Sequence, residues 1–350
     1  MEIKNLILSL TACAALISCE TSSPDTLTPA SCGTLILNNG NWGGNDSSIG
    51  MYDPQTKTYV PDAFYAVNGQ KLGDLGQDVI RFGQETYIAV NGSQTIFITD
   101  NDLKIKGHIN AEADGARLSP KYFTSGPDRI YVTYYEGYLG EIDPESLGVR
   151  ITAIGPNPEG ICMAGDRLYV AASGGMAYPA YTNTLSIVDM NTFTESGTVT
   201  VNVNPTKAEA SSDGAYVYVL SFGNYDNLPA MLEVLETATG KVSALEYASV
   251  SAIAASKDIL YILSGGYDEN WAPLPGTVYR HDMIRNRPLG SFVTDGTTLP
   301  DAYSISVAQD GMVYVGCSDY TSTGDVYVFS PEGILYDKFD SQGLNPLKAY

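Results

Sequence analysis

Short apolar segments separated by polar turns recur along the whole chain after residue 32. Each unit after the first carries an aromatic and β-branched segment such as Tyr218-Val219, and every unit has an apolar segment that ends at a tight turn. Seven such turns are found: Asp53-Pro54, Asp100-Asn101, Asp143-Pro144, Asp189-Met190, Glu236-Thr237, Asp282-Met283 and Ser330-Pro331. Their spacing of roughly 40–50 residues is that of a four-stranded propeller blade. No segment shows helical periodicity, so the pattern predicts an all-β, seven-bladed β-propeller.

The two ends of the repeat predict how the ring closes. The C-terminal residues 343–350 resemble residues 203–209, which open a blade, yet nothing follows them to complete one. The first repeat-like strand, residues 34–37, reads instead as the second strand of a blade. One blade is therefore expected to be shared between the N- and C-termini, which removes the sheet edge that an open ring would expose.

The N-terminal residues carry the features of a secretion signal. An apolar run, residues 6–17, follows Lys4 and is too short to span a membrane as a mature helix. It ends in Leu16-Ile17-Ser18-Cys19, which resembles the lipobox of bacterial lipoproteins; an ordinary signal peptide with an incidental cysteine is the alternative. We expect residues 1–18 to be a signal peptide, residues 19–32 a flexible tether lipidated at Cys19, and residues 33–350 the propeller.

Composition narrows the classes of partner. The chain has 19 Lys and Arg residues against 40 Asp and Glu residues, a formal net charge of −21. Such a surface argues against nucleic acid and against direct binding to anionic lipid, so membrane contact is expected only through the lipid anchor. Cys32, Cys162 and Cys317 show no CxxC spacing, which favours buried free thiols over a zinc site; a Cys32–Cys317 disulfide stays open.

The loops of the predicted blades fall on two faces. With strands A to D running outward from the axis, the A–B and C–D turns share one face, and the B–C loops and D–A links share the other. The turns of the first face are short and have ordinary turn composition. The B–C loops are longer and carry both tryptophans of the chain. Aromatic side chains there, with polar tips, predict a ligand-binding face. The expected ligand-binding residues are Trp42, Tyr138, Tyr178, Tyr181, Tyr225, Tyr267, Trp271 and Tyr320.

Catalysis is not indicated by the sequence. The two histidines, His108 and His281, fall outside the aromatic loops, so no histidine-based triad or metal cluster is expected. Five acidic residues do lie in these loops, where an acid/base pair or a calcium site is the alternative to ordinary turn chemistry. They are Asp46, Asp226, Asp268, Glu269 and Asp319. We expect a binding protein rather than an enzyme, with no cofactor and no resident metal.

Several segments resemble known propeller families. The segment NPTKAEASSDGAYVYVLSFG is similar to the YVTN/YncE-type repeat. NNGNWGGNDSSIGMYDP, NGQKLGDLGQDV and GDVYVFSPEGILYDKFDSQGLNP resemble propeller lipoproteins of gut Bacteroidetes, including the cobalamin-capturing (BtuG-type) and ferric-siderophore-capturing lipoproteins. The resemblance implies an outer-membrane, surface-exposed lipoprotein that captures a large metal chelate and passes it to a TonB-dependent outer-membrane transporter.

The identity of the cargo stays open at this stage. A ferric catecholate siderophore is anionic, and the B–C loops lack Lys and Arg; the nearest candidates are Lys71, Arg117 and Lys121. A corrinoid such as vitamin B12 is large, amide-rich and nearly neutral, which suits Tyr, Trp and Asn, so the loops lean slightly toward it. The alternatives are a protein- or glycan-interaction propeller without metal-chelate cargo, and a lyase or lactonase, which the paucity of histidine disfavours.

Overall fold

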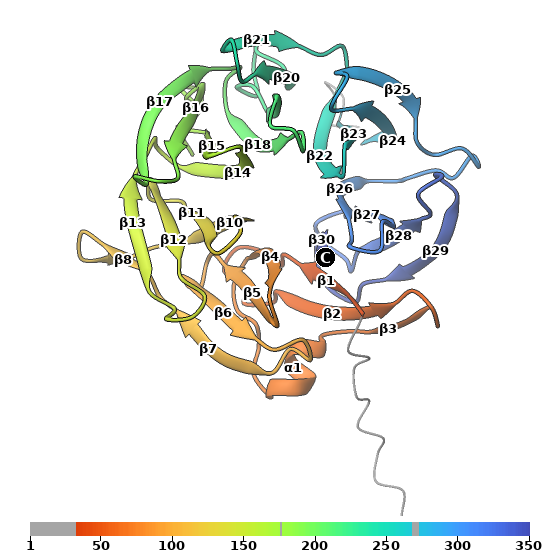
Figure 1. The fold of residues 1–350 in the computed structure, drawn as a ribbon. Coiled ribbons are helices and arrows are strands. Elements are labelled where there is room, and N and C mark those ends of the chain that lie inside the picture. The colour runs from red at the N-terminus through yellow and green to blue at the C-terminus, as the bar shows by residue number, and fades with distance from the viewer. Residues whose placement is uncertain (1–32, 176, 268–272) are drawn as a thin grey trace, which may run out of the picture.

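The computed structural model describes residues 33–175, 177–267 and 273–350 of the chain. Seven four-stranded antiparallel sheets are arranged around a central axis as blades (Figure 1). The predicted all-β, seven-bladed propeller is therefore confirmed. The signal peptide, Cys19 and the tether lie outside the described residues and stay predictions. No helix of the described part is long and apolar enough to cross a membrane.

The blades are numbered here in chain order, with strands given from the axis outward. Blade 1 consists of β30 (Pro346–Ala349), β1 (Thr34–Asn38), β2 (Ser48–Asp53) and β3 (Thr58–Val60). Blade 2 consists of β4 (Gly76–Phe82), β5 (Glu85–Val90), β6 (Thr95–Thr99) and β7 (Ile105–Ile109). Blade 3 consists of β10 (Pro120–Ser125), β11 (Ile130–Tyr134), β12 (Tyr138–Ile142) and β13 (Val149–Ala153).

The remaining four blades are built from consecutive strands. Blade 4 consists of β14 (Pro158–Ala164), β15 (Arg167–Ala172), β16 (Thr184–Asp189) and β17 (Thr194–Thr200). Blade 5 consists of β18 (Pro205–Ala210), β19 (Tyr216–Ser221), β20 (Met231–Glu236) and β21 (Lys241–Ala244). Blade 6 consists of β22 (Val250–Ser256), β23 (Ile259–Tyr267), β24 (Pro273–Asp282) and β25 (Arg287–Ser291). Blade 7 consists of β26 (Ala302–Val307), β27 (Val313–Cys317), β28 (Asp325–Phe329) and β29 (Leu335–Asp340).

Two small elements lie in links between blades. The helix α1 (Ala63–Asn68) joins blades 1 and 2, and the hairpin of β8 (Glu112–Ala113) and β9 (Ala116–Arg117) joins blades 2 and 3. The helix was not predicted from the sequence pattern. At six residues α1 is too short to show periodicity; it forms because Asp62 caps the Tyr65 N–H and Gly69 ends it at φ 66°.

The hydrophobic core lies between the blades rather than within any one of them. Among the described residues, buried apolar side chains form seven clusters, and each cluster joins two neighbouring blades. A repeated tyrosine of the second strand is buried in six blades: Tyr87, Tyr131, Tyr169, Tyr218, Tyr261 and Tyr314. Because each sheet buries its faces against neighbouring sheets, each blade depends on its neighbours for its packing.

The C–D turns are held by aspartate side chains, as the turn markers predicted. Asp53 accepts from the Thr56 hydroxyl and from the Gln55 N–H, both at 2.8 Å, and Asp143 accepts from the Ser146 and Glu145 N–H groups at 3.2 and 2.9 Å. These hydrogen bonds favour the ionised form and lower the pKa of both carboxyl groups. The acidic residues at these markers are therefore structural turn residues.

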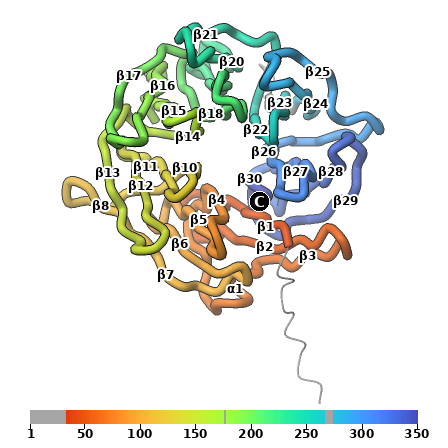
Figure 2. Tube along the Cα trace, viewed as in Figure 1, coloured from red at the N-terminus to blue at the C-terminus, as the bar shows by residue number. Residues whose placement is uncertain are grey.

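The ring is closed by the C-terminal strand. β30 pairs antiparallel with β1, with Leu37 opposite Lys348, and the Leu35 and Tyr350 backbones exchange two hydrogen bonds of 2.9 Å. Figure 2 shows the C-terminus beside β1. Asn345, just before β30, donates to the Gly40 carbonyl at 2.9 Å and accepts from Ser318 at 2.6 Å. The shared blade is confirmed, and all seven sheets are complete within residues 34–349.

Deletion of residues 343–350 is expected to destabilise the propeller by more than about 4 kcal/mol, because a whole inner strand and the packing at two blade junctions are lost. Thermal and urea unfolding of residues 33–350 and of the truncated form would measure the loss. A synthetic peptide of residues 343–350 should raise the melting temperature of the truncated form, and a scrambled peptide should not. Equal melting temperatures for the truncated and complete forms would contradict this account of closure.

Candidate ligand-binding site

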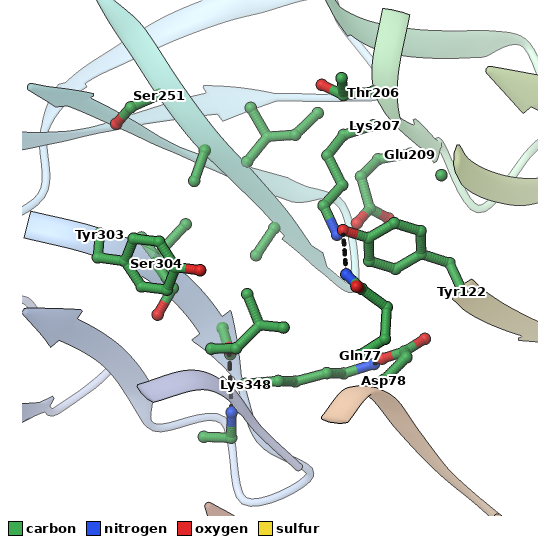
Figure 3. A pocket seen from close by; sticks show the side chains of 18 of the residues that line it. Gln77, Asp78, Tyr122, Thr206, Lys207, Glu209, Ser251, Tyr303, Ser304 and Lys348 are labelled. Atoms are coloured by element: carbon green, nitrogen blue, oxygen red, sulfur yellow. Dashed lines mark hydrogen bonds and ion pairs between the residues drawn. The ribbon is translucent and has the colours of Figure 1, made fainter. Parts of the chain in front are cut away.

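The seven inner strands surround a cavity of about 580 Å³ on the propeller axis (Figure 3). Every inner strand contributes its third residue to the wall. These residues are Asp78, Tyr122, Gly160, Lys207, Ala252, Ser304 and Lys348. The cavity volume lies within the usual range for small-molecule sites, and the wall mixes apolar surface with a few charged groups.

A backbone irregularity at the start of each inner strand sets what faces the axis. The pairing register of all seven inner strands shifts around the second residue, between Pro205 and Lys207 in β18 for example. A bulge breaks the alternation of a strand and re-aims its side chains. Consequently two consecutive residues, Thr206 with Lys207 or Tyr303 with Ser304, line the same cavity.

The B–C loops begin directly beside the inner strands. In six blades the backbone N–H just after the second strand donates to the carbonyl just before the inner strand, as Phe222 does to Asn204 at 2.9 Å and Ser318 to Asp301 at 2.9 Å; in blade 6 the donor to that carbonyl is Gly265, within the longer β23. This bond holds each B–C loop at the rim of the cavity. Phe222, Tyr225 and Tyr320 line the cavity from these loops, and none of the described lining residues belongs to an A–B turn. The cavity therefore opens toward the B–C face.

Two predicted binding residues, Tyr225 and Tyr320, line the cavity, and their side chains are 65% and 48% exposed. Tyr181 makes an edge contact with Tyr225, with ring centroids 5.9 Å apart, and Tyr178 makes one with Tyr181 at 6.5 Å. The three rings form a continuous aromatic strip that leads from the B–C face to the cavity.

Trp42 lies on a neighbouring part of the same rim. Its indole is 79% exposed, which is unusual for so large an apolar side chain. Its loop is held in place because the Gly43 N–H donates to both oxygens of Asp74, at 3.0 and 3.1 Å. The adjacent Asn41 side chain donates to the Tyr320 carbonyl at 3.4 Å, so the Trp42 and Tyr320 loops touch.

The other predicted residues are placed differently. Tyr138 packs against the core between blades 2 and 3 and donates from its hydroxyl to Asp114 of the β8–β9 hairpin, and it does not line the cavity. The Tyr267 backbone ends β23, and its side chain is outside the described part. Trp271 lies wholly outside the described residues. Their roles in binding stay predictions.

Several of the candidate acidic and histidine residues hold turns or pack in the core. Asp319 caps a turn by accepting the Thr321 and Ser322 N–H groups at 2.8 and 2.7 Å, which lowers its pKa, and Asp46 accepts the Asn41 N–H at 2.9 Å. Asp226 lies in the same loop as Tyr225, while Asp268 and Glu269 lie outside the described part. His281 is fully buried and contacts Tyr247 and Asn286 at 3.0 and 2.9 Å. No cluster of three metal-ligating residues occurs in the described ranges.

Charged side chains of the cavity wall were missed by reasoning confined to the loops. Lys348 of β30 forms an ion pair with Asp78 of β4, whose Oδ2 also accepts the Phe123 N–H at 2.8 Å. Near the rim, Lys121 of β10 pairs with Glu159 of β14 at 2.7 Å. Each pair joins two blades, and in each the lysine charge is balanced by a carboxylate.

Lys207 has a different environment. The structure shows no ion pair or hydrogen bond of its ammonium with any described residue, and its closest contact is the Tyr122 ring, 3.5 Å from Nζ to the centroid. The Tyr122 hydroxyl is held by Gln77 at 2.9 Å (Figure 3). Lys207 lines the cavity and is only partly exposed to solvent. This burial lowers the pKa of Lys207 to about 8.

Glu209 lies two residues further along β18 and also lines the cavity. Burial disfavours its ionised form and raises its pKa to about 7, although Lys207 and Lys348 act in the opposite direction. Four inner strands begin with a proline, namely Pro120, Pro158, Pro205 and Pro346. Aligning the inner strands on this first residue shows that the third residue of each strand lines the wall. None of the three predicted siderophore candidates, Lys71, Arg117 and Lys121, lines the cavity. Lys71 donates instead to the Asn45 carbonyl at 3.2 Å, and Lys121 pairs with Glu159.

Comparison with known proteins supports the fold alone. No protein-family model and no curated protein matches the sequence. Among solved structures, Kuenenia stuttgartiensis hydrazine synthase is similar with a TM-score of 0.55 and 16% identity, covering 70% of this chain and 73% of that one. The Neurospora crassa Pan2 WD40 domain is similar with a TM-score of 0.53 and 9% identity, covering 74% and 78%. The propeller is thus shared with an enzyme and with a WD40 domain, and the fold does not assign an activity.

The raised pKa of Glu209 predicts a pH-dependent effect of Glu209→Gln. Between the unfolded-state pKa of about 4.5 and the folded-state value of about 7, the folded protein holds a proton that the unfolded chain releases, so stability falls as pH rises. The glutamine variant lacks this loss. The free energy of unfolding of the variant, minus that of the parent, should therefore be roughly 1–3 kcal/mol larger at pH 8 than at pH 5.

Urea unfolding of both proteins at pH 5 and pH 8 would measure this difference. Glu145→Gln, at an exposed glutamate of the blade 3 C–D turn, is the matched control and should show no such change. A Glu209→Gln variant whose stability relative to the parent is the same at both pH values would contradict the assignment.

Proposed function

We propose that this propeller is a lipid-anchored surface protein that binds a small molecule at its B–C face and passes it to a TonB-dependent outer-membrane transporter. One observation carries the binding part: a cavity of about 580 Å³ lies beneath exposed aromatic rings, Tyr225 and Tyr320, on a rigid ring of sheets. Exposed aromatic surface around a concave site is typical of ligand binding. The anchor and the transporter rest on the lipobox and on the family resemblance.

The cargo proposed is a large metal chelate, either a corrinoid or a ferric siderophore. The cavity is too small to enclose such a molecule entirely, so the chelate would lie across the rim with one part inserted. The lysines of the inner strands change the balance between the two candidates. Two of them are paired with carboxylates, and the third, Lys207, supplies a cationic group that the B–C loops lack and thereby favours an anionic chelate more than the loops alone do.

A protein- or glycan-interaction role is the second candidate. The Tyr178–Tyr181–Tyr225 strip is exposed and continuous, which also suits docking of a partner surface. The two candidates differ in what the cavity does, because a docked protein or glycan would cover the rim without requiring the wall residues.

Trp42→Ala and Tyr225→Ala should each weaken binding of the chelate by roughly 30-fold, since a buried aromatic anchor contributes about 2 kcal/mol or more. Binding of residues 33–350 to cyanocobalamin and to ferric siderophores would be measured by calorimetry and by intrinsic tryptophan fluorescence. Tyr65→Ala, at a 50% exposed tyrosine of α1 in the link between blades 1 and 2, is the matched control and should bind normally.

His281→Ala is unsuitable as a control, because its buried contacts make that variant a stability mutant. If neither chelate class binds, or if both rim variants bind as the parent does, metal-chelate capture at this rim is wrong. Retained binding of a glycan or of a transporter fragment in that case would favour the second candidate.

Cys19→Ala should release the protein from membrane fractions, because the lipid is the proposed means of attachment. Fractionation of cells that express the parent and the variant, with mass spectrometry of the N-terminal peptide, would measure attachment and lipidation. Cys162→Ala, at a buried thiol, is the matched control and should remain in the membrane fraction. Membrane retention of the unlipidated variant would overturn the anchor.

A further inference from the structure

Among the described residues that line the cavity, Lys207 is a lysine that forms no ion pair. Lys348 and Lys121 are each joined to a carboxylate, Asp78 and Glu159. Lys207 instead rests on the face of Tyr122, and no carboxylate of the described residues lies within ion-pairing distance of its ammonium. A buried ammonium without an anion is costly, and a cation–π contact offsets only part of that cost.

We propose that Lys207 is the binding residue for an anionic oxygen group of the ligand, a carboxylate, sulfonate or catecholate, inserted from the aromatic rim. This deepens the proposed function, on which it rests, by naming the chemistry of the part of the ligand that enters the cavity. The ligand class is then an anion with a flat or apolar body, whose body lies on Tyr225 and Tyr320 while its anionic group reaches Lys207.

The geometry supports insertion from this side. The third residues of the inner strands lie close to the B–C face, because each inner strand begins there, and the rim residues and Lys207 line one continuous cavity. Thr206 and Ser251 also line this cavity, and their hydroxyls donate to the Leu220 and Leu263 carbonyls at 3.3 and 3.4 Å, so Lys207 supplies the cationic group for the anion. The Gln77–Tyr122 hydrogen bond fixes the ring on which Lys207 rests (Figure 3).

Glu209 should link binding to pH. A bound anion opposes the negative form of Glu209 and favours its protonated form, while Lys207 must stay protonated to attract the anion. Both effects make binding tighter as the pH falls from about 8.5 to 6, given the pKa values of about 8 and about 7. The titratable or charged groups around Lys207 and Glu209 are Asp78, Lys121, Tyr122, Glu159, Cys162 and Lys348.

Two probes of nearly the same shape can separate charge from apolar contact. 8-Anilinonaphthalene-1-sulfonate has an aromatic body and a sulfonate that stays ionised across this pH range, and N-phenyl-1-naphthylamine has the same body without the charge. Fluorescence titration of residues 33–350, whose ring is complete, should show tighter binding of the sulfonate at pH 6 than at pH 8.5.

Lys207→Met should weaken binding of the sulfonate probe by about tenfold or more at pH 7. Binding of the neutral probe should be nearly unchanged, because only the anion interacts with the ammonium. Lys104→Met, which removes an exposed lysine in the blade 2 C–D turn, is the matched control for net charge and should change neither probe. Glu209→Gln acts in the opposite direction. It should tighten binding of the sulfonate probe at pH 8 and reduce the pH dependence of that binding between pH 6 and 8.

The outcomes distinguish this inference from the proposed function. If neither probe binds, or if Tyr225→Ala leaves the neutral probe unaffected, the small-molecule site at the rim fails. If the neutral probe binds at the rim and Lys207→Met leaves the sulfonate unaffected, the site stands and the anion assignment is overturned. Should Lys207→Met fail to fold, an unchanged sulfonate affinity in Glu209→Gln at pH 8 would overturn it equally.

Discussion

The pairing of β30 with β1 is the interaction on which the rest of the molecule depends. Every hydrophobic cluster of the described chain spans two blades, so no blade has a core of its own. The ring therefore packs cooperatively. When β30 pairs with β1, blade 1 is completed and can pack against both blade 7 and blade 2. A closed ring also fixes the distance between opposite inner strands, which holds the cavity open against collapse and places its wall residues without help from loops.

The fold could be predicted from the sequence because every repeat ends in a turn with a recognisable residue pattern. Asp143-Pro144 and the related dipeptides recur because each C–D turn needs an acceptor for the same backbone N–H groups. The wall of the cavity left no comparable signal. Strand alternation would send Thr206 and Lys207 to opposite faces, whereas the shift in register at the start of β18 turns both toward the axis.

The rim could be predicted only in part, for a different physical reason. Tyr225 and Tyr138 both belong to B–C segments, yet Tyr225 lines the cavity while Tyr138 turns outward to Asp114 of the β8–β9 hairpin. The length of the loop decides this. The blade 5 loop, residues 222–230, is long enough to lie over the axis, and the blade 3 segment between β11 and β12 is a tight turn. The aromatic composition of a loop alone therefore does not show whether its tyrosine lines the cavity.

The charge of the inner strands is nearly balanced, with Lys121, Lys207 and Lys348 against Asp78, Glu159 and Glu209, whereas the molecule as a whole is strongly acidic. The chain carries a net charge of −21, but three lysines stand on its inner strands and Glu209 is held partly protonated near neutral pH. An anion approaching the protein meets a repulsive field that salt screens over about 10 Å, and beyond the rim it meets a local cation in a low-dielectric wall. The aromatic strip bridges these two regions, because apolar contact is insensitive to the sign of the outer field. Selection by shape and apolar area would therefore act first at the rim, and selection by charge only inside, at Lys207.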